Sequence, residues 1–190
     1  DGTYGQGSTI DITVTFDETV TVTGTPQLML ETGTTDRVVD YASGTGSNTL
    51  TFQYTVQSGD TNADLGYVGT SALALNGGTI QDGAGNDATL TLPTAGAANS
   101  LSDNKALVVD GVAPTLAGTA STNFGENGTG TVLDIDADDG SGADTNVGYS
   151  LTGGTDQADF SIDGTNGQLT FDSAPDFENP ADSDNNNAYV

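Results

Sequence analysis

The sequence contains no cysteine and no histidine. Without cysteine the chain forms no disulfide and offers no thiolate to a metal. Without histidine it lacks the commonest general base and the usual protein ligand of transition metals. It also has no nucleophile elbow, phosphate-binding loop or zinc motif. We therefore expect the chain not to be an enzyme.

Basic residues are almost absent as well. Arg37 and Lys105 stand against 27 acidic residues, which gives a net charge of −25. Nucleic acids and anionic membranes need lysine and arginine to neutralise phosphate, so we expect neither as a partner. No apolar run approaches the roughly 20 residues of a membrane-spanning helix. The charge suits a secreted protein in water rich in divalent cations, because bound metal relieves self-repulsion.

What the chain does contain favours strands. Glycine, threonine, aspartate and asparagine are frequent, which disfavours helix and favours short strands joined by turns. Apolar residues alternate strictly over residues 10–16 and 50–56, the period of a half-buried strand. Asp17-Glu18 is expected to be a turn, and residues 88–92 a short strand. At 190 residues, this pattern predicts an all-β chain of β-sandwich type.

The densest acidic stretch is 134–146, which holds five carboxylates, an amide and two glycines but no cation. Like charges this close repel one another unless a cation lies among them. Oxygen ligands on glycine-containing loops suit a hard divalent ion, Ca²⁺ above all. The alternative is a solvated acidic loop.

Two further segments alternate oxygen-bearing side chains in the manner of calcium loops. The segment near the C-terminus has Asp182, Asp184 and Asn186, and the segment in the first half has Asp60, Asn62 and Asp64. The segment near the C-terminus lacks the following glycine and distal glutamate of an EF-hand. A flexible polar turn is the alternative for that segment.

Residues 1–112 resemble bacterial immunoglobulin-like repeats from giant surface adhesins of the biofilm type. The matching pieces are Asp1-Gly-Thr-Tyr-Gly5, 10–16, Gly24-Thr-Pro-Gln-Leu28, 50–54, Ile80-Gln-Asp-Gly-Ala-Gly-Asn86 and Val109-Asp-Gly-Val-Ala-Pro114. In such repeats a strand usually precedes the first of these pieces. The resemblance therefore implies that the sequence opens inside an immunoglobulin-like β-sandwich.

Residues 113–190 resemble a cadherin-like repeat of the bacterial type. The matching pieces are Phe124-Gly-Glu-Asn127, 132–138, Tyr149-Ser-Leu-Thr-Gly153, Phe160-Ser-Ile-Asp163, 166–171 and 175–180. Pro114 marks the boundary, because proline restricts the residue before it and ends strand pairing. The repeat implies two more strands after Val190, so we expect this second β-sandwich to be incomplete at its C-terminus.

The cadherin-like resemblance also implies calcium ligands in two groups. The first group would be Asp136 and Asp138, facing the junction and Asp110. The second group would face the following domain and consists of Glu126, Asp176 and Glu178.

From these features we expect a calcium-stiffened structural module of a secreted bacterial adhesin stalk, located at the cell surface. It would mediate cell adhesion or biofilm attachment. Its partners would be adjacent repeats of the same polypeptide, and a cell-surface glycan or protein. Three alternatives stay open. They are a subunit of an extracellular filament in which neighbouring subunits donate strands, a calcium-dependent glycan-binding module, and an accessory part of a glycosidase.

Overall fold

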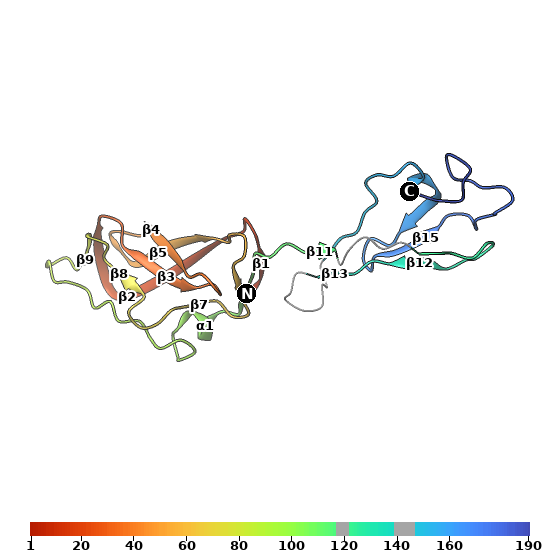
Figure 1. The fold of residues 1–190 in the computed structure, drawn as a ribbon. Coiled ribbons are helices and arrows are strands. Elements are labelled where there is room, and N and C mark those ends of the chain that lie inside the picture. The colour runs from red at the N-terminus through yellow and green to blue at the C-terminus, as the bar shows by residue number, and fades with distance from the viewer. Residues whose placement is uncertain (117–121, 139–146) are drawn as a thin grey trace. The chain divides into compact units, whose positions relative to one another are not determined.

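The computed structural model describes residues 1–116, 122–138 and 147–190, and it confirms the all-β prediction (Figure 1). The chain forms two compact units, Asp1–Ala113 and Pro114–Val190. The predicted boundary between residues 112 and 113 lies one residue away. Within the described ranges, no helix is both long and apolar enough to cross a membrane.

The first unit is a β-sandwich with one short helix in its described residues. Its elements are β1 (Gly2–Gly5), β2 (Thr9–Thr23), β3 (Gln27–Glu31), β4 (Arg37–Ser43), β5 (Ser47–Thr55), β6 (Thr61–Asn62), β7 (Gly66–Tyr67), β8 (Leu73–Ala74), β9 (Thr79–Gln81), α1 (Leu101–Asn104) and β10 (Leu107–Asp110). One sheet has the order β7-β3-β4-β5-β2-β9, with β8 also paired to β3. The other has the order β1-β10-β6. The β1–β10 pair is parallel, and the other strand pairs of this unit are antiparallel.

The core of this unit comes from the two alternating segments that the sequence reveals. Across the antiparallel pair β2–β5, Ile10 lies opposite Tyr54 and Ile12 opposite Phe52. All four side chains are buried. Their neighbours Asp11, Thr13, Gln53 and Thr55 point to the other face, and all four are exposed to solvent. The period of two thus places one face of the sheet in the core.

The predicted turn at Asp17-Glu18 is wrong. Strand β2 continues through both residues, and its pairing with β5 shifts register between Thr15 and Val20. Val20 still pairs with Ser47 of β5, and from Thr21 to Thr23 the strand pairs with β9 instead. A bulge absorbs the irregular sequence by bending the strand rather than ending it, which lets one strand serve two partners.

The predicted strand over residues 88–92 is also absent. Two backbone bonds nevertheless hold this segment, from Ala88 N to Ile80 O and from Leu92 N to Thr70 O. Helix α1 follows, and its N-cap Ser100 accepts a hydrogen bond from Asp103 N. Such a cap satisfies an N–H group that the first turn leaves without a helical partner.

The second unit contains β11 (Thr115–Leu116), β12 (Thr131–Asp134), β13 (Ala137–Asp138), a 3₁₀ turn (Gln157–Asp159), β14 (Phe160–Ile162) and β15 (Gln168–Phe171). Its sheets have the orders β12-β15-β14 and β11-β13. Strands β14 and β15 form a hairpin in which Ile162 lies opposite Leu169. In the turn, Asp163 accepts hydrogen bonds from Thr165, and Gly167 adopts a φ of +72°.

Half-buried aromatic rings form a cluster in the second unit. The ring centroid of Phe171 lies 4.4 Å from that of Phe160, 5.4 Å from that of Phe124 and 4.9 Å from that of Tyr189. These residues come from β14, β15 and two loops. The C-terminal segment of the chain is therefore packed against the hairpin through Tyr189.

Candidate functional site

Three carboxylates gather at one place in the second unit. Glu126 lies in the turn that precedes β12, and Asp176 and Glu178 lie in the loop after β15. One oxygen of each lies within 4.8 Å of the others. A hydrogen bond from Asn127 N to Pro175 O, at 2.8 Å, joins the two loops directly beside the cluster. The structure therefore brings together the second predicted ligand group across fifty residues of sequence.

The loop after β15 winds around the carboxylate of Asp176. Its Oδ1 accepts hydrogen bonds from Glu178 N at 3.0 Å and Asn179 N at 3.1 Å. These bonds fix the orientation of the Asp176 side chain. Both are accepted by Oδ1, and neither involves Oδ2. A carboxylate held in this way presents its second oxygen in a defined position without further ordering cost.

The electrostatics of the cluster are those of crowded negative charge. The hydrogen bond with Glu178 and the negative charge of Glu178 raise the pKa of Glu126, with smaller contributions from desolvation and from Asp176. The N–H of Phe177 acts in the opposite direction. Neighbouring negative charges favour the protonated form of a carboxyl group. A cation bound among them would favour the ionised form instead.

The donor set fits a calcium ion. Ca²⁺ takes oxygen ligands at about 2.3–2.6 Å, so two oxygens on one ion lie up to about 5 Å apart. The separations of at most 4.8 Å within the cluster fall inside that limit. All three side chains are exposed, so water has access to complete the coordination.

The first predicted group is distributed over both units. Asp110 ends β10 in the first unit, where its Oδ1 accepts a hydrogen bond from Val112 N at 3.2 Å. Asp136 is exposed between β12 and β13 of the second unit. Asp138 belongs to β13 and pairs with Thr115. The remainder of the acidic stretch, residues 139–146, lies outside the described residues.

The predicted ligands near the C-terminus share one loop. The backbone N–H of Asn186 donates to Asp182 Oδ2 at 2.8 Å, and its side-chain amide donates to Asp184 Oδ2 at 2.7 Å. Asn186 thereby links both carboxylates. Asn185 and Asn187 have φ of +58° and +64°, which wind the loop tightly around this group.

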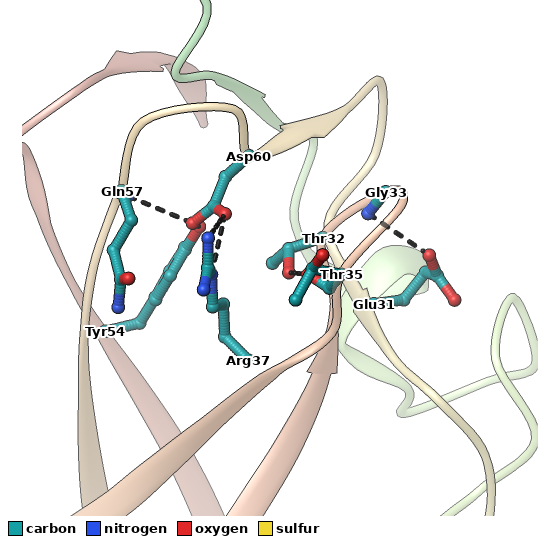
Figure 2. A network of polar contacts seen from close by, with 8 residues as sticks. All are labelled: Glu31, Thr32, Gly33, Thr35, Arg37, Tyr54, Gln57 and Asp60. Atoms are coloured by element: carbon teal, nitrogen blue, oxygen red, sulfur yellow. Dashed lines mark hydrogen bonds and ion pairs between the residues drawn. The ribbon is translucent and has the colours of Figure 1, made fainter.

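Asp60 is not a calcium ligand but half of an ion pair in the first unit. It is 1% exposed, and Figure 2 shows its carboxylate surrounded by protein donors. Arg37 Nε and Nη2 each lie 2.7 Å from Oδ1, while Tyr54 Oη at 2.6 Å and Gln57 N at 2.9 Å donate to Oδ2. Burial alone would raise the pKa of Asp60, but these donors outweigh burial and hold the pKa below its usual value.

The other two oxygen ligands predicted in this segment support a turn. Asn62 Oδ1 accepts a hydrogen bond from Asp64 N at 2.9 Å, and Asn62 Nδ2 donates to Glu31 O at 2.7 Å. With Asp60 bound to Arg37, the three side chains do not act together on an ion. The prediction of a metal site here is therefore wrong, because the nearest cation is the guanidinium of the chain itself.

Sequence reasoning missed Asp156, which is 4% exposed. Its Oδ1 accepts a hydrogen bond from Ser183 N at 2.7 Å and its Oδ2 from Val190 N at 2.9 Å. These backbone donors lower the pKa of Asp156, against the effect of burial. No local pattern signals such a role, because its partners lie 27 and 34 residues further along the chain.

No family model matches the chain, and no solved structure matches it. Part of the chain is similar to Halomucin. This protein of Haloquadratum walsbyi (strain DSM 16790 / HBSQ001) is 39% identical over 103 residues, which are 53% of the chain. The match covers 1% of the length of Halomucin. The assignment to adhesin and cadherin-like repeats therefore stays a prediction.

Proposed function

We propose that the chain is a structural segment of a cell-surface protein, and that its second unit binds Ca²⁺ through Glu126, Asp176 and Glu178. The convergence of these three carboxylates within 4.8 Å carries the proposal. The similarity to Halomucin, whose name describes a mucin, supports a location outside the cell.

The charge distribution explains why the second unit would depend on a cation. Of the 27 acidic residues, 14 lie in Pro114–Val190, and both basic residues lie in the first unit. The second unit therefore has no lysine or arginine to offset its carboxylates. A bound Ca²⁺ would join the loops before β12 and after β15 and cancel repulsion between them. A stiffened segment of this kind suits the stalk of an adhesin, which holds a binding domain away from the cell.

Calcium should raise the melting temperature of the second unit. A ligand that binds only the folded state, at about a hundred times its dissociation constant, stabilises that state by roughly 2.7 kcal/mol. The full chain is melted in millimolar Ca²⁺ and in chelator, with NMR signals of β14 and β15 reporting on the second unit. Calorimetric titration counts the bound ions. The variant with Glu126→Gln, Asp176→Asn and Glu178→Gln should lose one bound ion and the part of the shift that this ion supplies.

The matched control removes three exposed carboxylates from the first unit, by Asp17→Asn, Glu18→Gln and Asp36→Asn. It has the same net charge as the triple variant, so a general effect of charge would appear in both. An ion count unchanged in the triple variant would overturn the proposed site. So would a melting temperature that is the same in calcium and in chelator.

Phe177 favours a second function, calcium-dependent binding of a glycan. Its side chain is 65% exposed between two residues of the carboxylate cluster, Asp176 and Glu178. It also lines a cavity of about 540 Å³ whose wall includes Phe124 and Tyr189. An exposed aromatic ring beside a metal offers a sugar both an apolar face and hydroxyl coordination. A glycan array tests this function. It is supported if the chain binds a glycan, if chelator abolishes that binding, and if Phe177→Ala weakens it at least tenfold. The absence of any calcium-dependent signal would dismiss it.

A further inference from the structure

The loop near the C-terminus contains a buried oxygen atom that has no protein donor. Asp182 is 3% exposed, and its Oδ2 accepts the hydrogen bond from Asn186 N. Its Oδ1 is buried and has no hydrogen-bond partner. Among the residues that the structure describes, it is the one buried side-chain oxygen or nitrogen in this condition. A buried charged oxygen without a partner is costly, so it indicates a ligand that completes the site.

The second unit offers no cation of its own at this place. Residues 114–190 contain no lysine, arginine or histidine. In the first unit, the comparable buried carboxylate of Asp60 is paired with Arg37. Asp182 has no such neighbour within its unit. A second buried carboxylate, that of Asp156, accepts a hydrogen bond from the backbone N–H of Ser183, the residue that follows Asp182. Two buried carboxylates, Asp182 on the loop and Asp156 in contact with it, thus lie without a positively charged side chain in their unit, a state that an external cation relieves.

The same loop supplies further oxygen ligands. Asp184 and Asn186 alternate with Asp182, and Asn186 is hydrogen-bonded to both carboxylates. Such an irregular set of oxygens suits Ca²⁺, whose coordination is flexible. Mg²⁺ demands a near-ideal octahedron and keeps several waters. We propose that Asp182, Asp184 and Asn186 form a second calcium site, separate from the cluster of Glu126, Asp176 and Glu178.

The position of the loop indicates that an ion bound there would anchor the C-terminal segment of the second unit. Immediately after it, Val190 N is bound by Asp156, and the Tyr189 ring packs against Phe160 at 5.7 Å and Phe171 at 4.9 Å. A calcium ion on the loop fixes the start of this segment, while the aromatic contacts fix its end. Calcium binding is therefore expected to change the surroundings of Tyr189 as well as those of the loop.

The test uses the full chain carrying Glu126→Gln, Asp176→Asn and Glu178→Gln, which removes the other proposed site. Calcium is titrated while NMR follows the amide signals of Ser183, Asn186 and Val190. We expect a saturable shift of these signals. Adding Asp182→Asn should raise the Kd at least tenfold. Adding Asp184→Asn, at an exposed position, should raise the Kd several-fold with the folded spectrum retained, so the test holds even if Asp182→Asn fails to fold.

Asp36→Asn in the first unit is the charge-matched control and should leave the Kd unchanged. A titration without saturation would overturn the proposal and leave Asp182 Oδ1 to a water molecule. An equal Kd with and without Asp184→Asn would also overturn it, and so would an equal response to Mg²⁺ at the same concentration. Because the other site is already removed, none of these results bears on the function proposed above.

Discussion

Arg37→Met should lower the free energy of unfolding of the first unit by about 3 kcal/mol. The substitution leaves the Asp60 carboxylate, which is 1% exposed, without its cation. Removing one partner of a buried ion pair typically costs about 3–5 kcal/mol, since the other charge stays buried and uncompensated. We expect the lower end of that range, because the Arg37 side chain is 24% exposed and water reaches it.

Urea unfolding of the full chain, followed by NMR signals of β2 and β5, measures this change. Lys105→Met is the matched control, since Lys105 is the other basic residue of the chain and is exposed. It alters the net charge by the same amount and should change the stability by less than about 0.5 kcal/mol. If both variants are equally stable, the pair does not contribute to the fold in the way the structure indicates.

Phe52→Ala should destabilise the first unit by about 3–5 kcal/mol. Phe52 is fully buried in β5, opposite Ile12, and its ring meets that of Tyr41 edge-on with centroids 6.2 Å apart. Truncation removes these contacts and leaves a cavity in the sheet face that forms the core. The same urea experiment measures the loss.

Thr55→Ala is the control for Phe52→Ala, because Thr55 is exposed on the same strand. It should change stability by no more than about 0.5 kcal/mol. A loss below about 1 kcal/mol for Phe52→Ala would mean that the neighbouring side chains close the cavity, and that this face is not the rigid core described above.

The strands were predictable where the hydrophobic period decides their position. Ile10 and Ile12 face the core as the alternation requires. The prediction failed at Asp17-Glu18, where two acidic residues interrupt the pattern. Whether the strand ends at such an interruption or continues through a bulge depends on its partner strands. One of these partners, β9, lies more than fifty residues away in sequence. Local sequence does not contain that information.

The sites were predictable only in part for the same reason. Glu126, Asp176 and Glu178 were grouped through a family resemblance, and the structure brings them together. The spacing of Asp60, Asn62 and Asp64 equals that of Asp182, Asp184 and Asn186, yet only Asp60 has Arg37 beside it. Spacing describes the available oxygens. The competing donor, 23 residues earlier in the chain, decides what they bind.

The parallel pairing of β1 and β10 determines how the first unit resists tension. Gly2 pairs with Leu107 and Gly5 with Asp110, so the chain enters at one end of this pair and leaves at the opposite end. A force that pulls Asp1 and Ala113 apart drags the two strands past each other along their length. Their hydrogen bonds then carry the load in shear and must rupture together, whereas an antiparallel pair pulled from one end would open one bond at a time.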